Sequence, residues 1–169
     1  MEEKVLLNAS VSLLVKDNQV LLSLKTKKIG AGCWNGYGGG IEEGETPVQA
    51  AVRELKEESS VVALAEDLEK MAIMDFHNKK SDGTTFICRV YYFIIRKWTG
   101  EAKEINEMTN PTFFDKDNLP YDKMMPADKE YFLLILNGKK VVGKAKYGPY
   151  QKELLEDVII KEVDSFPED

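Results

Sequence analysis

The spacing of hydrophobic and polar residues along this chain predicts a series of β-strands. Residues 5–15 and 19–25 are rich in Val, Leu and Ser, and a turn-forming Lys-Asp-Asn separates them, so we expect a hairpin. Residues 69–78 and 84–97 predict two longer strands joined through a Ser-Asp-Gly turn. The second of these is β-branched and aromatic enough to lie at the centre of a sheet. Other strands are expected at 111–115, 139–147 and 156–163.

The clearest helical pattern in the chain follows Glu45. Thr46 suits the N-cap, Pro47 suits the first helical position, and Gln49 completes a capping box. Apolar side chains then recur at helical spacing and must face a core: Val48, Ala51, Val52 and Leu55. We therefore expect a helix that begins at Pro47 and ends near Ser60.

The remaining segments complete an α/β pattern. Residues 126–136 predict a second helix, and the polar, acidic residues 99–110 predict a loop. Residues 30–40 are rich in glycine, but large aromatic residues are interspersed, so we expect an ordered segment rather than a flexible linker. Helical and strand patterns alternate over 169 residues without a clear linker. We therefore expect residues 1–169 to form one α/β domain.

Composition narrows the range of partners. The formal net charge is −6, which argues against polymeric nucleic acid, because affinity for a phosphate backbone depends mainly on Lys and Arg. A small phosphorylated ligand remains compatible with this charge, since a bound cation reverses the local sign of an acidic site. The single histidine, His77, excludes a site that needs two histidines.

The cysteines and the apolar runs predict the cellular compartment of the protein. Cys33 and Cys88 are too few for a disulfide framework, so a reducing compartment is expected. The chain opens with charged residues and shows no signal-peptide pattern. Its longest apolar run, residues 91–95, is too short to span a bilayer. We expect a soluble cytoplasmic protein with no membrane partner.

Three glutamates follow one edge of the predicted helix. Glu54, Glu57 and Glu58 stand at positions i, i+3 and i+4, which places their side chains on one face, with Arg53 beside them. A glutamate-rich face is by itself most often a solvated surface. Here, however, the glycines of residues 38–40 allow backbone to approach a ligand closely. Carboxylate and carbonyl oxygens suit Mg²⁺ or Mn²⁺ rather than zinc, so a hard-cation site is the alternative to a plain surface.

The order and spacing of these residues carry a family resemblance. Gly39, Glu45, Arg53-Glu54-Leu55 and Glu57-Glu58 closely resemble the Nudix box of the Nudix hydrolase superfamily, over residues 39–61. The resemblance implies an α/β/α sandwich around a mixed β-sheet. It also implies metal-assisted attack of water on a phosphorus of a nucleoside diphosphate derivative. One residue departs from the pattern: Ser60 stands where the family usually has glycine, which normally helps the helix end in a left-handed turn.

The resemblance also implies roles for single residues. Glu57 and Glu58 would be the main metal ligands, together with the carbonyl of Gly38. Glu54 would bind metal or act as general base, and Arg53 would orient a glutamate through an ion pair. The resemblance does not decide which glutamate takes the proton, and several carboxylates would be able to hold more than one ion.

Segments outside the box are similar to the Nudix group that hydrolyses oxidised purine nucleoside triphosphates. In residues 30–39 the similarity includes Asn35, which in that group contacts the purine edge, and Asp128 would do the same. Glu107 corresponds to an extra carboxylate near the metal. Two further positions depart from the group's pattern: Met125 replaces a tryptophan that stacks on the base, and Ala127 replaces the first of two aspartates.

These observations predict a Mg²⁺-dependent pyrophosphohydrolase of purine nucleoside triphosphates such as 8-oxo-dGTP, releasing a monophosphate and pyrophosphate. Met125 packs against a base in this interpretation, and Lys25 contacts phosphate. Trp34 is either a ligand contact or core packing, and Asn35 is either a ligand contact or a turn residue. Two alternatives remain: a Nudix hydrolase of dinucleoside polyphosphates, ADP-ribose or nucleotide sugars, and a non-catalytic nucleotide-binding module. Both monomer and homodimer stay open.

Overall fold

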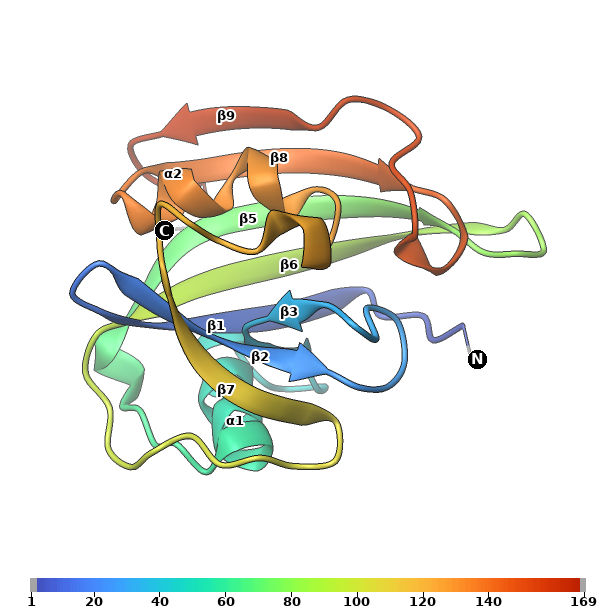
Figure 1. The fold of residues 1–169 in the computed structure, drawn as a ribbon. Helices are drawn as coiled ribbons and strands as arrows, with labels where there is room; N and C mark the ends of the chain where they lie inside the picture. Colours follow the sequence, from blue (N-terminus) through green and yellow to red (C-terminus); the bar gives the residue numbers. More distant parts are fainter. Residues whose placement is uncertain (1–2, 168–169) are drawn as a thin grey trace.

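The structure is a computed structural model that describes residues 3–167, and a mixed sheet forms its centre (Figure 1). Within the described residues the sheet has nine strands, with the path β3-β2-β1-β6-β5-β8-β9, while β4 pairs with β1 and β7 pairs with β2. The strands are β1 (Asn8–Lys16), β2 (Gln19–Lys25), β3 (Trp34–Asn35), β4 (Tyr37–Gly40), β5 (Leu68–Lys79), β6 (Thr85–Ile95), β7 (Met108–Asp115), β8 (Lys140–Tyr147) and β9 (Ile159–Val163). The α-helices are α1 (Pro47–Ser59) and α2 (Phe132–Leu136), and short 3₁₀ turns occupy Ala65–Asp67 (η1), Tyr121–Lys123 (η2), Asp128–Glu130 (η3) and Pro149–Gln151 (η4).

Parallel and antiparallel pairs occur together in this sheet. β1 runs parallel to β6, and β5 runs parallel to β8, whereas the remaining strand pairs are antiparallel. The predicted hairpin of β1 and β2 and the predicted pairing of β5 with β6 are present. The predicted mixed sheet is therefore confirmed.

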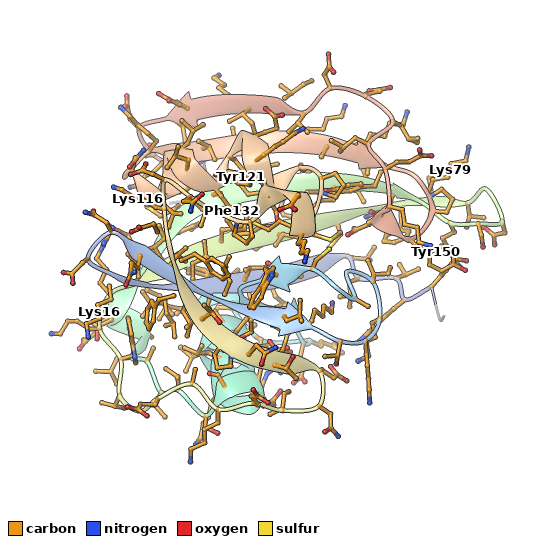
Figure 2. The ribbon with its side chains drawn as sticks, viewed as in Figure 1. Lys16, Lys79, Lys116, Tyr121, Phe132 and Tyr150 are labelled. Atoms are coloured by element: carbon orange, nitrogen blue, oxygen red, sulfur yellow. The ribbon has the colours of Figure 1, made fainter. Side chains whose placement is uncertain are left out.

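Alternate residues of the central strand β6 face two separate cores. Tyr92 and Ile94 pack in one cluster with Phe132 of α2. Phe93, on the opposite face, packs in another cluster with Ala51 of α1. Successive side chains of a strand point to opposite faces, so the two helices cover the two sides of the sheet, and the predicted α/β/α sandwich is confirmed. In Figure 2 Phe132 points into the fold, and its side chain is fully buried, whereas Lys16 extends outward.

Helix α1 begins and ends as the sequence predicts. The Thr46 hydroxyl accepts a hydrogen bond from the Gln49 amide at 3.1 Å, and the Gln49 side chain accepts one from the Thr46 amide at 2.9 Å. At the other end Ser60 adopts the left-handed conformation, with φ 67°, and its amide donates to the Lys56 carbonyl. The helix terminates there although no glycine is present.

Two predicted boundaries are wrong. Residues 126–136 form the turn η3 and a five-residue α2 instead of one helix. The Asp128 carboxylate accepts the Met125 amide at 3.2 Å, and such local side-chain bonds compete with continuous helix. Strand β7 begins at Met108, inside the predicted loop, and its pairing with β2 shifts register around Asn110 and Pro111. An irregularity of this kind accommodates a proline within a strand.

The two α-helices are 13 and 5 residues long. No helix among residues 3–167 is long and apolar enough to cross a bilayer.

Candidate active site

A cavity of about 340 Å³ lies beside β4 and the carboxylates of α1 and extends to the turn η4. The glycines of β4 and two carboxylates of α1 lie at one end: Gly38, Gly39, Gly40, Glu54 and Glu58. Polar and aromatic side chains from other elements lie elsewhere along it: Asn35, Tyr92, Met125, Asp128 and Tyr147. One hollow therefore joins an acidic end to an end suited to a planar, polar ring.

The glycines of β4 are needed because the backbone there is closely packed. A Cβ atom on Gly38 would lie 1.9 Å from the Ser10 carbonyl oxygen, and one on Gly39 would lie 2.6 Å from Oε1 of Glu54. Real Cβ atoms do not approach so closely. The absence of side chains therefore lets α1 bring its carboxylates against the backbone of β4.

Arg53 holds together the carboxylates on the outer side of α1. Its Nε donates to Glu45 at 2.7 Å, and one terminal nitrogen donates to Glu54 at 3.0 Å and to Glu57 at 3.2 Å. The other terminal nitrogen donates to Glu45 and to the Gly40 carbonyl. The Arg53 hydrogen bonds, with one from the Glu42 amide, lower the pKa of Glu45 to about 2. Arg53 is thus placed to orient glutamates, as the family resemblance implies.

Glu58 is the deepest carboxylate of this group. The Gly38 amide donates to its Oε1 at 2.6 Å. Burial raises the pKa of Glu58 to about 7, and the charges of Glu54 and Glu107 add to this rise against the opposing effects of Gly38 and Lys25. A carboxylate in such surroundings gains stability as an anion when a cation lies beside it.

Lys25 and Glu107 reach the same end of the cavity from different elements. Lys25 ends β2, and burial lowers its pKa although Glu58 and Glu107 act in the opposite direction. Glu107 precedes β7 and forms an ion pair with Lys28 at 3.3 Å. Both side chains line the cavity. The extra carboxylate expected near the metal therefore lies on the same side as Glu58.

The donor chemistry of this end fits a hard divalent cation. Glu54, Glu58 and Glu107 line the cavity and offer carboxylate oxygens, which such cations prefer. The Glu54 carboxylate lies directly against Gly39, where a Cβ would be 2.6 Å from its Oε1. Within residues 3–167 no three acidic, His or Cys side chains yet converge on one point. Arg53 meanwhile engages Glu54 and Glu57.

Asp128 lies at the other end of the cavity, almost completely buried. Its carboxylate accepts the Met125 amide at 3.2 Å and the Tyr131 hydroxyl at 3.1 Å, and Tyr131 is 2.7 Å from the hydroxyl of Tyr92. Burial raises the pKa of Asp128 to about 7, because these hydrogen bonds offset only part of the lost hydration. Asn35 also lines the cavity, and its Oδ1 accepts the Gly36 amide at 2.8 Å.

Three residues of the predicted site lie away from the cavity lining. Trp34 packs edge-on against Phe114, with ring centroids 5.0 Å apart, in agreement with the core-packing alternative. Arg53 lies behind the carboxylates that it binds, and the Glu57 side chain is 58% exposed. The predicted residues that do line the cavity are Lys25, Asn35, Gly38, Glu54, Glu58, Glu107, Met125 and Asp128.

Two tyrosines of the cavity were not predicted from the sequence. Tyr92 comes from the middle of β6 and Tyr147 from the end of β8. Neither tyrosine belongs to a sequence motif. The alternation of side chains along a strand predicts which face of the sheet each tyrosine lies on, but not which residues it contacts. Their convergence on Asp128 required the pairing of β5 with both strands.

Comparison with known proteins decides the family. A family model described as the NUDIX domain matches residues 6–135. The chain belongs to the Nudix family. An oxidized purine nucleoside triphosphate hydrolase of Danio rerio is 38% identical to this Nudix chain over 135 residues, covering 80% of this chain and 83% of the relative. The protein of the same name from Mus musculus is 34% identical over 154 residues, covering 91% and 94%. The prediction of a Nudix hydrolase is thereby confirmed.

Solved structures show the same fold. The MutT protein from Bacillus halodurans superposes on this Nudix chain with a TM-score of 0.78, covering 92% of this chain and 97% of that one at 23% identity. The Escherichia coli ORF135 protein gives a TM-score of 0.62 at 21% identity, covering 79% and 91%. At these identities the likeness concerns the fold alone. Nudix hydrolases in general depend on a divalent metal ion.

Proposed function

We propose that this protein is a Mg²⁺-dependent pyrophosphohydrolase of purine nucleoside triphosphates, oxidised ones such as 8-oxo-dGTP among them. The reaction adds water across a phosphoanhydride bond and releases the nucleoside monophosphate and pyrophosphate. The two relatives named above as oxidized purine nucleoside triphosphate hydrolases support the substrate class. We also propose that residues 1–169 form one Nudix domain, because β8 and β9 continue the sheet beyond the matched region.

The observation that carries the proposal is the shared cavity. Glu58 and Lys25 lie at one end, and Asn35 and Asp128 line the same hollow. An anionic polyphosphate fits an end where a lysine and metal-binding carboxylates meet, while a purine edge fits an amide and a buried carboxyl. Neither end alone would distinguish a triphosphate enzyme from a general phosphate site.

Glu54, Glu57, Glu58 and the Gly38 carbonyl would hold the cation, with Glu107 available beside them. A bound Mg²⁺ or Mn²⁺ supplies charge neutralisation for the polyphosphate and activates water. Arg53 keeps Glu54 and Glu57 oriented through the bonds described above. Lys25 contributes positive charge toward the phosphates.

The test is turnover of a nucleotide panel with Mg²⁺ by the wild type and by Glu58→Gln. The panel contains 8-oxo-dGTP, dGTP, dATP, ADP-ribose and a dinucleoside polyphosphate. Gln keeps the shape of Glu58 and accepts the Gly38 amide, but it carries no charge for a cation. We expect turnover to fall by about 100-fold or more, since even outer partners of a metal site cost about 10- to 100-fold.

Glu66→Gln is the matched control, because Glu66 is exposed on η1, away from the cavity. Full activity of Glu66→Gln with loss in Glu58→Gln supports the proposal. Near-normal turnover by Glu58→Gln contradicts it. Turnover of ADP-ribose or a dinucleoside polyphosphate in preference to all triphosphates would favour the second enzyme class. Tight nucleotide binding by the wild type without product would favour a non-catalytic module.

A further inference from the structure

Tyr147 brings a hydroxyl group to the end of the cavity where Asn35 and Asp128 lie, here called the purine end. The residue ends β8, only 1% of its surface is exposed, and it lines the cavity beside Asp128. Its oxygen accepts the backbone N–H of Ala127 at 2.9 Å. Its ring stacks on Phe76, with centroids 5.8 Å apart. The hydroxyl is thus held from two sides.

The hydrogen bond from Ala127 leaves Tyr147 with a proton to donate. A phenol hydroxyl carries one proton and accepts through its oxygen, and the Ala127 N–H occupies that oxygen. In the part of the chain that the structure describes, the Tyr147 hydroxyl donates no hydrogen bond. Buried donors without an acceptor are rare in folded proteins. A ligand atom that accepts a hydrogen bond would give the Tyr147 hydroxyl proton its missing partner.

Asp128 offers the opposite function next to this donor. Asp128 directly follows Ala127, whose N–H binds the Tyr147 hydroxyl, and both Asp128 and Tyr147 line the cavity. Burial raises the pKa of Tyr147, and the charge of Asp128 adds to this rise. Each Asp128 oxygen accepts one hydrogen bond from the protein, from Met125 and from Tyr131. A carboxylate has about four acceptor positions. Asp128 therefore keeps capacity to accept from a ligand.

We propose that Tyr147 determines base specificity by donating its hydroxyl proton to the 6-oxo oxygen of a purine while Asp128 accepts the adjacent N1–H. This inference rests on the proposed function and names the base class. A 6-oxopurine presents an acceptor at position 6 and a donor at N1, matching a donor beside an acceptor. A 6-aminopurine instead presents a donor at position 6 and an acceptor at N1. Its donor would face the Tyr147 hydroxyl proton, and its acceptor would face the Asp128 carboxylate. Mismatched pairs of this kind exclude a ligand more strongly than a poor apolar fit does.

The absence of an aspartate at position 127 agrees with this assignment. Ala127 is fully buried and has no side-chain acceptor of its own. Its backbone N–H instead orients the hydroxyl of Tyr147. The purine edge would thus meet one carboxyl and one phenol.

The experiment compares dITP with dATP, because these substrates differ only at position 6 and in the protonation of N1. We expect wild-type kcat/KM to favour dITP. Tyr147→Phe keeps the ring and removes the proton, so the 6-oxo group would be buried without a donor. The loss of this hydrogen bond should lower kcat/KM for dITP by roughly 5- to 100-fold. The kcat/KM for dATP should stay unchanged or rise. The dITP-to-dATP ratio would fall by the same factor.

Tyr37→Phe is the matched control. Tyr37 is also 1% exposed, but its hydroxyl bonds to the Ser23 hydroxyl at 2.5 Å and does not line the cavity. We expect this variant to leave the dITP-to-dATP ratio unchanged. A ratio that stays at the wild-type value in folded Tyr147→Phe overturns the assignment, as does a ratio that falls equally in Tyr37→Phe.

Binding to the wild-type protein supplies a second measurement should Tyr147→Phe fail to fold. Calorimetric titration with dIMP and dAMP should give a tighter Kd for dIMP, and equal values overturn the inference. This titration does not depend on turnover. A wild type that binds dIMP selectively but hydrolyses no nucleoside triphosphate would therefore refute the proposed function and leave the role of Tyr147 standing.

Discussion

Replacing Asp128 by asparagine should flatten the pH dependence of stability. The folded protein raises the pKa of Asp128 from 3.8 to about 7 by burial. A raised acid pKa means that the folded state binds the proton more tightly than the unfolded state does. The resulting stability is complete below the unfolded pKa and is lost as the pH rises through the folded pKa. The amide introduced by Asp128→Asn cannot titrate, and it is able to bond both the Met125 N–H and the Tyr131 hydroxyl.

The size of the effect follows from the two pKa values. A difference of about 3 units corresponds to about 4 kcal/mol over the whole titration, at about 1.4 kcal/mol per unit. Between pH 5 and pH 8 the integrated loss for this one group is about 3 kcal/mol. Glu58 also makes the free energy of unfolding fall as the pH rises, because burial raises its pKa as well. That fall is common to both proteins and cancels in their difference.

The assay is urea unfolding of the wild type and Asp128→Asn at pH 5 and pH 8, with a chelator present so that no metal binds Glu58. The wild type should lose about 3 kcal/mol more of its free energy of unfolding than the variant across this interval. Equal losses in the two proteins would mean that Asp128 ionises normally despite its burial. In that case the description of the purine end as a buried, weakly acidic site would be wrong.

Two other substitutions test the packing around α1. Gly39→Ala would place a Cβ 2.6 Å from Oε1 of Glu54 and displace that carboxylate. The Mg²⁺ concentration for half-maximal turnover should therefore rise about 10-fold or more. An unchanged Mg²⁺ concentration for half-maximal turnover would contradict the close approach of Glu54 to Gly39. Ser60→Gly should relieve the left-handed conformation at φ 67°, stabilising by about 1 kcal/mol. Calorimetry should then show a Tm higher by about 2–4 °C, whereas a lower Tm would show that Ser60 is not strained.

Sequence reasoning was most successful where the determining interactions are local. The cap at Thr46, the proline after it and the i, i+3, i+4 glutamates act within one helix, so their positions follow from spacing alone. It failed over residues 126–136, where the Asp128 side chain competes for backbone N–H groups and interrupts the helix. Propensity does not reveal that competition, because it depends on where the buried carboxyl points.

Spacing along α1 put three glutamates on one edge, but it could not say that Glu58 is partly buried while Glu57 is largely exposed. That difference arises from contact with β4, and burial in turn sets the pKa of Glu58. Similarly, Asp128 and Tyr147 are separate in the chain and meet only because β8 pairs with β5. Periodicity and capping are properties of neighbouring residues, whereas burial, charge proximity and a shared cavity depend on which distant strands lie side by side.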